Sequence, residues 1–173
     1  GSGTIPIEAA LIAKNRAPGL ERSFAAQKWK TMPGTLWLDA AEEAMDKEFH
    51  GSYDIWGGDI DPAAVELSRH NAALAGVEDC VRFEVADAGK FHRESAYGQL
   101  VTNPPYGERL LEKTEAEALY RRFGAAARTL PPGWRVVVLS SHTEFERAFG
   151  RPADKKRKLY NGMLKCDAFL YGR

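Results

Sequence analysis

The stretch "LVTNPPYGERL" at residues 100–110 indicates how the chain is built and where its chemistry lies. The apolar and β-branched residues before Asn103 can form a β-strand. Pro104 and Pro105 cannot continue that strand, because proline has no backbone N–H and its φ angle is fixed. The strand must therefore end near Asn103. At that end the chain presents a side-chain amide, carbonyl groups on a stiff backbone and the aromatic ring of Tyr106.

The composition is that of an ordinary globular chain, with 44% hydrophobic and 28% charged residues, and we treat residues 1–173 as one domain. No apolar run reaches the ~18 residues of a membrane helix, and no stretch resembles a signal peptide. Cys80 and Cys166 have no metal-ligand spacing. We expect two buried thiols in a reducing cytoplasm, and no metal. The net charge of zero gives no general attraction for phosphate.

Strand and helix patterns alternate along the chain. Strands are predicted at residues 53–59, 81–86, 98–103 and 134–141, and helices at residues 6–15, 36–49, 62–76, 116–130 and 143–149. Two further strands, 156–160 and 163–171, flank the dipeptide Asn161-Gly162, which favours a tight hairpin. The pattern predicts an α/β sheet that is mostly parallel and has an antiparallel C-terminal hairpin.

Carboxylates follow two of the predicted strands. Asp59 ends a strand in "GGDIDP", where it can accept hydrogen bonds from ribose hydroxyls while Ile60 lies against a purine face. Asp87 ends the next strand and can accept from an adenine amino group. Either aspartate could instead cap a helix or a turn, and Asp61 is expected to cap the helix that begins at Pro62. Ligands of open α/β sheets bind at the carboxyl ends of strands, which favours the binding roles.

The glycine loop, Gly1-Ser2-Gly3-Thr4, opens the first predicted helix, which Thr4 can cap. Its backbone amides can approach an anionic or carboxylate group closely. An ordinary glycine turn is the alternative. The spacing G-x-G-x-x-P differs from the G-x-G-x-x-G of dinucleotide binders, which disfavours a nicotinamide oxidoreductase.

The glycine loop, the two strand-end acids and Asn-Pro-Pro-Tyr together resemble the class I S-adenosylmethionine-dependent methyltransferases, in which this motif marks methylation of planar nitrogens. The lone pair of such a nitrogen is delocalised, so it is a poor nucleophile. The Asn103 side-chain oxygen and the Pro104 carbonyl can accept its N–H groups and aim the lone pair at the methyl group. Pro105 helps to hold the carbonyls in place, and Tyr106 can stack on the base.

Four segments narrow the resemblance: "GSGTIPIEAALIAKNRAPGL", "GGDIDPAAVELSRHNAALAGV", "NPPYGERL" and "LYNGMLKCDAFLY". They resemble the bacterial THUMP-containing 23S ribosomal RNA guanine-N2 methyltransferases, from Gly1 to about Tyr171 except in the variable residues 20–50. The resemblance implies S-adenosylmethionine as cofactor and ribosomal RNA as substrate. It implies catalytic roles for Asn103, Pro104, Pro105 and Tyr106, and cofactor binding by Gly1, Ser2, Gly3, Thr4, Asp59, Ile60, Asp87, Ala88 and Asn103.

In that family a strand and an Asp-Pro-x-Cys segment precede the glycine loop, and an N-terminal THUMP domain binds RNA. The sequence contains neither feature. We therefore expect the first strand of a Rossmann-like sheet and an RNA-binding domain to lie upstream of Gly1 in a longer protein, and most of the affinity for RNA to come from that part.

Other features have two interpretations each. The basic run 155–158 could contact RNA phosphate or protect an edge strand from aggregation. Glu108 and Arg109 could contact the base or its flanks, while Trp29 and Trp37 are expected in the core. The motif also serves methylation of adenine N6 or of a protein glutamine. A non-catalytic RNA-binding or assembly module is the alternative from another class.

Overall fold

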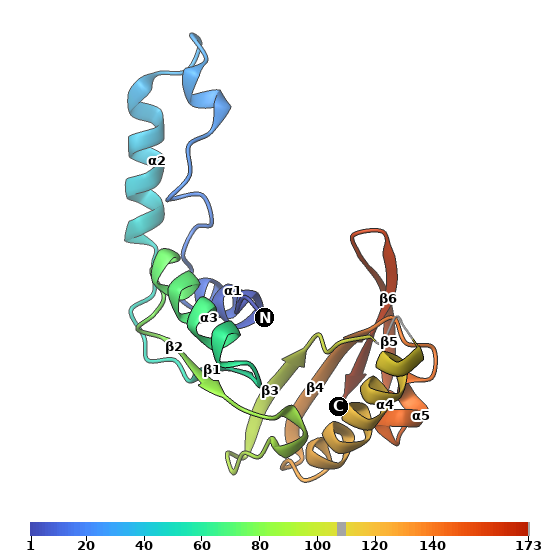
Figure 1. Ribbon diagram of the computed structural model, residues 1–173. Helices are drawn as coiled ribbons and strands as arrows, with labels where there is room; N and C mark the ends of the chain where they lie inside the picture. Colours follow the sequence, from blue (N-terminus) through green and yellow to red (C-terminus); the bar gives the residue numbers. More distant parts are fainter. Residues whose placement is uncertain (107–109, 173) are drawn as a thin grey trace. The chain divides into compact units, whose positions relative to one another are not determined.

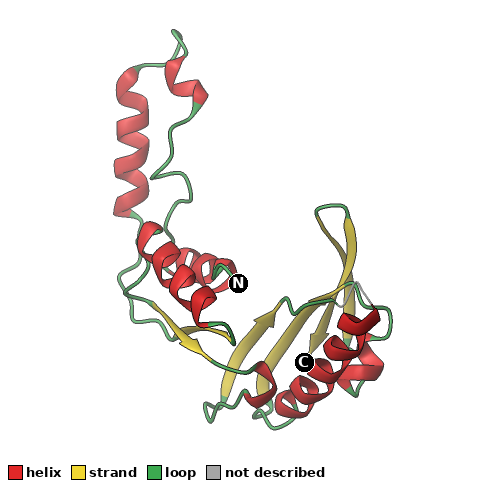
Figure 2. Ribbon diagram, viewed as in Figure 1, coloured by secondary structure: helices red, strands yellow, loops and turns green. Residues whose placement is uncertain are grey.

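The computed structural model describes residues 1–106 and 110–172, whose elements are drawn in Figures 1 and 2. The helices are α1 (Thr4–Ala13), α2 (Gly34–Asp46), α3 (Pro62–Leu74), α4 (Leu110–Ala127) and α5 (Phe145–Phe149), with short 3-10 helices η1 (Ala25–Lys28) and η2 (Ala88–Lys90). The strands are β1 (Ile55–Asp59), β2 (Val81–Val85), β3 (Tyr97–Thr102), β4 (Gly133–Ser140), β5 (Lys155–Asn161) and β6 (Leu164–Tyr171). Every predicted strand and helix is found, with shifted ends, and η1 and η2 were not predicted.

The chain forms two compact units. The first contains Gly1–Gly57 and Asp61–Val85, and the second contains Gly58–Ile60 and Ala86–Arg173. Each unit has its own cluster of buried hydrophobic side chains.

The core of the first unit joins α1 and α3 to β2. Its buried members are Ile7, Ala10, Val65, Ala72, Val77, Cys80, Val81 and Phe83. Strands β1 and β2, which α3 connects, form a two-stranded sheet. Helix α3 begins as predicted: Pro62 is its first residue, and the Asp61 carboxylate accepts the Ala63 N–H at 2.9 Å.

The segment between α1 and β1 includes η1 and α2. Its base is held by an ion pair of 3.0 Å between Arg16 and Glu48. Farther along, Phe24 stacks on Trp37 with ring centroids 5.5 Å apart, and Trp37 is half-buried. Trp29, in contrast, is 61% exposed, so its predicted place in the core is wrong. The backbone becomes extended at Trp29, directly after η1, and the side chain is exposed to solvent there.

The second unit is built on a four-stranded sheet with strand order β3-β4-β6-β5. Strands β3 and β4 are parallel, whereas β6 is antiparallel to both β4 and β5. Helices α4 and α5 pack together and against one face, where aromatic residues dominate the core: Tyr120, Phe123, Phe145, Phe149, Phe169 and Tyr171. The alternating burial of β4 shows the same face, because Val136, Val138 and Ser140 are buried.

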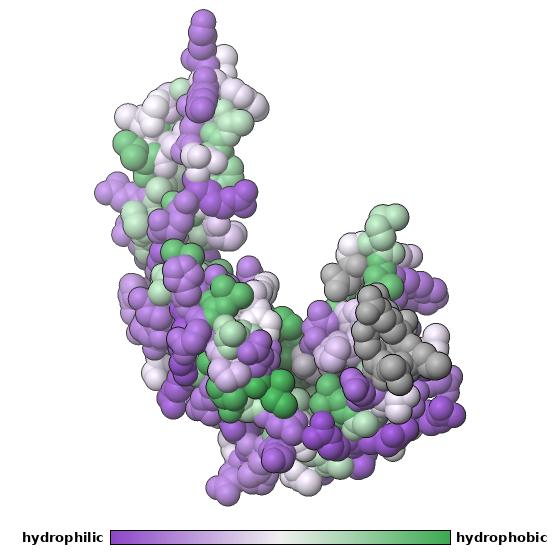
Figure 3. Space-filling model, in the orientation of Figure 1, coloured by the Kyte–Doolittle hydropathy of each residue, from purple (hydrophilic) through white to green (hydrophobic). Residues whose placement is uncertain are grey.

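These sheets confirm the predicted α/β class, with parallel strands and an antiparallel C-terminal hairpin. Cys80 and Cys166 are buried free thiols, as predicted. Within the described ranges, no helix is long and apolar enough to cross a membrane. The surface in Figure 3 mixes hydrophilic and hydrophobic side chains along α2.

Candidate active site

The motif loop, Asn103–Tyr106, follows the last residue of β3 and is held by a contact from α4. The Tyr120 side chain is fully buried, and its hydroxyl donates a hydrogen bond of 2.6 Å to the Pro105 carbonyl. Burial raises the pKa of Tyr120, so the hydroxyl keeps the proton that it donates. The position of the loop is therefore fixed by a helix that begins after it in the chain.

A buried polar group lies behind Tyr120. The Ser140 Oγ, at the end of β4, is 3.4 Å from the Tyr120 hydroxyl and accepts the backbone N–H of His142 at 3.1 Å. The His142 ring packs edge-on against Tyr120, with centroids 5.7 Å apart. Burial lowers the pKa of His142, which favours a neutral imidazole beside the tyrosine. Contacts from the end of β4 therefore help to position the Tyr120 ring on α4.

The exposed side of the motif loop presents Asn103. The Tyr106 hydroxyl donates to the Asn103 Oδ1 atom. An amide oxygen has two lone pairs, so Oδ1 can accept a second hydrogen bond. Asn103 itself is exposed, and Tyr106 is half-buried. The loop can therefore accept the N–H of a planar ligand without first breaking its own hydrogen bond.

The end of β1 carries the first predicted acid. Asp59 is half-buried, and its backbone carbonyl accepts the Ala86 N–H at 2.8 Å, which fixes the end of β1 beside the segment that leads to Asp87. Ile60 follows with 68% of its surface exposed. A carboxylate next to an open apolar side chain suits a ligand that has both hydroxyls and a flat apolar face.

Asp87 is more constrained than the sequence indicated. One carboxylate oxygen accepts the Gly89 N–H at 2.8 Å and the other binds Arg122 at 3.1 Å, so Asp87 does cap the turn into η2. A carboxylate has about four acceptor positions, and two of them are used here. Ala88 is exposed beside it. A binding role for Asp87 would have to share the carboxylate with Arg122.

The glycine loop belongs to the first unit and is held by α3. The Ser68 hydroxyl lies 3.1 Å from the Gly1 carbonyl, and the Asn71 side-chain N–H donates to the Ser2 carbonyl at 2.9 Å. The predicted cap at Thr4 is wrong: Gly3 is the N-cap residue, and Thr4 lies inside α1. Its hydroxyl is 2.8 Å from that of Ser2 instead.

Gly3 explains why Thr4 is not the cap. Its φ of 76° lies in the left-handed region, which residues with a side chain rarely adopt. A Cβ atom at Gly3 would stand 2.8 Å from the Ser68 Cβ and 3.0 Å from the Phe83 ring. The tight packing of the loop on α3 and β2 thus requires glycine at this position.

The predicted residues divide between the units. Asp59, Ile60, Asp87, Ala88 and the motif loop are in the second unit, and the glycine loop is in the first. Glu108 and Arg109 lie outside the described residues. The supporting side chains of Ser68, Asn71, Tyr120 and Arg122 were not predicted, because helical periodicity marks a buried face and not the hydrogen bonds made there.

The chain is similar to known methyltransferases in both sequence and fold. Residues 1–169 match the family described as "RMKL-like, methyltransferase domain". The chain is 42% identical over 175 residues to "Putative RNA methyltransferase YpsC" of Bacillus subtilis (strain 168), covering 99% of this chain and 44% of that protein. It is 39% identical over 176 residues to "Ribosomal RNA large subunit methyltransferase K/L" of Shewanella baltica (strain OS185), covering 99% and 25%.

A solved structure is similar over the whole chain. It is described as "SMU.472, a putative methyltransferase complexed with SAH", with a TM-score of 0.95, 42% identity, and coverage of 100% of this chain and 46% of that one. The chain therefore spans less than half of each of these three proteins. The fold is that of the class I methyltransferases, and the chain belongs to the RMKL-like methyltransferase domain family.

Proposed function

We propose that this chain is the catalytic domain of an S-adenosylmethionine-dependent enzyme that methylates the N2 amino group of a guanine in ribosomal RNA. The motif loop carries the proposal, because it presents the exposed Asn103 amide on a backbone that Tyr120 fixes from within the core. Family membership supports methyl transfer, and the names of the relatives support RNA as the substrate class.

The loop would act by orienting the amino group. The Asn103 Oδ1 atom accepts one N–H, and we assign the second acceptor to the Pro104 carbonyl, because the Pro105 carbonyl is bound by Tyr120. Two acceptors favour a more tetrahedral nitrogen, whose lone pair then points at the methyl group. The ring of Tyr106 would stack on the base. The nitrogen can lose its proton to water after the transfer, so the loop needs no separate general base.

The cofactor would supply an activated methyl group, and its use is supported by the SAH complex of the related structure. Fit to this chain rests on the chemistry of the strand ends. We assign the ribose hydroxyls to the half-buried Asp59 and a face of the adenine to the exposed Ile60. Asp87 and Ala88 would contact the adenine edge. We assign the carboxylate end to the glycine loop, whose backbone amides begin α1.

We also propose that the chain is one domain, residues 1–173, of a longer protein that works in the cytoplasm. The relatives named above are more than twice as long as the part that they share with this chain. An RNA-binding domain of the THUMP type before Gly1 would supply most of the affinity for RNA. The net charge of zero supports that division of labour.

Two substitutions in the full-length protein test the assigned roles. Asn103→Ala should slow single-turnover methyl transfer by roughly 10²–10³-fold, as for the loss of one preorganised polar contact, and leave cofactor affinity unchanged. Asp59→Ala should weaken cofactor binding by about 1.5–3 kcal/mol in calorimetry, the range for hydrogen bonds to a charged group.

Methyl transfer and cofactor binding, measured together, distinguish a catalytic Asn103 from a cofactor-binding Asn103 and from a non-catalytic protein. Normal transfer by Asn103→Ala would remove the motif loop from the reaction. Loss of cofactor binding in a folded Asn103→Ala protein would place Asn103 in the cofactor pocket instead. A wild-type protein that binds RNA but neither binds cofactor nor transfers methyl would be a non-catalytic RNA-binding or assembly module.

A further inference from the structure

The hairpin formed by β5 and β6 concentrates positive charge in a chain that has none overall. Residues 155–171 contain five lysines and arginines and one acidic residue, Asp167, which stands opposite Lys158, although the whole chain has 24 basic and 24 acidic residues. Within residues 1–106 and 110–172, Lys156 is the member of this set that forms an ion pair, with Glu146 at 2.8 Å. The other cations are Lys155, Arg157, Lys158 and Lys165, and all are exposed.

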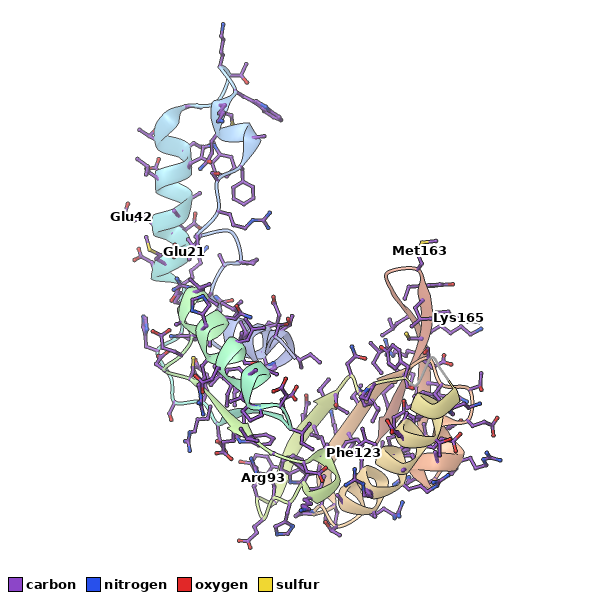
Figure 4. All side chains as sticks on the ribbon, in the orientation of Figure 1. Glu21, Glu42, Arg93, Phe123, Met163 and Lys165 are labelled. Carbon is purple, nitrogen blue, oxygen red and sulfur yellow. The ribbon has the colours of Figure 1, made fainter. Side chains whose placement is uncertain are left out.

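An aromatic ring lies among these cations. Tyr160 is 72% exposed and stands directly opposite Lys165 in the antiparallel register, so both side chains are on the same face. Lys158, two residues before Tyr160, shares this face. Met163 at the turn is fully exposed. Figure 4 shows Met163 and Lys165 near the end of the hairpin, and Figure 3 shows hydrophobic and hydrophilic side chains side by side there.

The strand register places this face of the hairpin at the same end of the sheet as the motif loop, beyond the C-terminal end of β3. Thr102, the last residue of β3, pairs with Val138 of β4, which pairs with Phe169 of β6. Lys165 lies four residues beyond Phe169 toward the turn, which is about 13 Å past the end of β3 at the usual rise per residue. Because β6 runs antiparallel to β4, the hairpin projects past the same edge from which Asn103 continues.

The lateral separation is also small. One strand, β4, lies between β3 and β6, so these two strands are two spacings, or about 10 Å, apart. All four strands belong to one compact unit. Nucleotides that flank a base held at Asn103 can therefore reach the end of the hairpin.

We infer that the β5–β6 hairpin binds the RNA strand that flanks the target base, with Lys158 and Lys165 on phosphates and Tyr160 stacked on a base. The inference rests on the proposed function. An exposed ring between cations is the combination that binds single-stranded nucleic acid with little sequence preference. A broad apolar contact area would favour a protein partner, whereas this hairpin carries five cations in a chain with no net charge.

The test uses the full-length protein and deproteinised 23S ribosomal RNA, with affinity measured by fluorescence anisotropy over a series of salt concentrations. The variant Lys158→Ala with Lys165→Ala should make the slope of log affinity against log salt shallower by about 1.4, at roughly 0.7 for each lost contact to a single strand. The matched control, Lys28→Ala with Lys30→Ala, removes two exposed lysines of the first unit and should leave the slope unchanged.

Tyr160 provides a separate measurement. Tyr160→Ala should weaken binding roughly 5- to 150-fold, the range for one base–aromatic stack, with the slope unchanged. Tyr160→Phe keeps the ring and should restore the affinity. Calorimetry with S-adenosylmethionine should give the wild-type value for every variant.

The inference is overturned if the double variant keeps the wild-type slope, or if the control changes it equally. Unchanged affinity in Tyr160→Ala would remove the stacking role. Methyl transfer by the wild-type protein is measured on the same RNA. Transfer to RNA with unaffected hairpin variants contradicts this inference alone. A wild-type protein that neither binds nor methylates the RNA contradicts the proposed function, and this inference with it.

Discussion

In the glycine loop Gly1 and Gly3 leave the backbone free at two of four residues, whereas in the motif loop the rings of Pro104 and Pro105 fix two successive φ angles. Both loops precede a helix, and both present polar groups at their surface. They differ in what their supporting contacts must do. Contacts to the glycine loop must create its shape, while contacts to the motif loop need only place a shape that already exists.

The observed contacts follow this difference. On α3, Asn71 donates to the Ser2 carbonyl of the glycine loop and the Ser68 hydroxyl lies 3.1 Å from the Gly1 carbonyl. Phe83 and Ser68 leave no room for a side chain at Gly3. The motif loop is tied to α4 by the hydroxyl of Tyr120, which donates to the Pro105 carbonyl. A substitution should therefore disturb folding in the glycine loop and catalysis in the motif loop.

The largest effect on stability is expected for Gly3→Ala. Alanine would have to adopt the left-handed conformation and move Ser68 or Phe83, at a combined cost of about 2–4 kcal/mol in the free energy of unfolding. Urea unfolding measures the change. Gly34→Ala is the control, because a Cβ at Gly34 meets nothing within 4 Å, and its effect should stay within about 1 kcal/mol. Equal stabilities of the two variants would show that packing does not shape the glycine loop.

Tyr120→Phe, which removes the contact to the motif loop, should reduce methyl transfer much more than stability. Loss of one hydrogen bond should cost about 1 kcal/mol of stability. Methyl transfer should fall roughly 10- to 100-fold, because a small displacement of the Pro105 carbonyl moves Asn103 as well. Cofactor affinity, measured by calorimetry, should not change.

Tyr171→Phe is the matched control for Tyr120→Phe. The Tyr171 hydroxyl is buried in the core of the same unit and has no hydrogen-bond partner among the described residues. Its removal should leave both stability and transfer near the wild-type values. A Tyr120→Phe enzyme as active as Tyr171→Phe would show that the hydroxyl has no positioning role.

The smallest effect is expected for Ser68→Ala, which removes a hydroxyl that lies 3.1 Å from the Gly1 carbonyl and 2.8 Å from the Ala64 carbonyl. The cost should be about 0.5–1.5 kcal/mol in urea unfolding. The double variant with Gly3→Ala should be more stable than the sum of the single effects predicts, because Ser68 Oγ occupies part of the space that a new Cβ needs. Strict additivity would contradict the packing described around Gly3.

The sequence predicted local features of the fold well. The Asp61 cap, the hairpin around Gly162 and the strand ends at Asp59 and Asn103 all depend on neighbouring residues, and all are found. Features that depend on contacts between distant residues were missed. Thr4 was predicted as the N-cap of α1, but Gly3, with its left-handed backbone conformation, is the N-cap. Trp29 was predicted in the core but is exposed.

The supporting residues of the candidate site were missed for the same reason. The helix that carries Tyr120 was predicted, but the hydrogen bond of Tyr120 joins residues 15 positions apart in the chain. Arg122 binds Asp87 across 35 positions. Such pairs become visible only when the helix packs on the sheet, so the sequence alone could suggest candidate site residues but not the contacts that hold them.

The most direct test of the central claim identifies the methylated atom. The full-length protein is incubated with 23S ribosomal RNA and S-adenosylmethionine that carries a deuterated methyl group, and the digested nucleosides and peptides are analysed by mass spectrometry. The account predicts deuterated N2-methylguanosine, greatly reduced in Asn103→Ala. Deuterated N6-methyladenosine, or label on a protein glutamine, would contradict the assignment to guanine N2, and absence of label in any product would contradict the proposed activity.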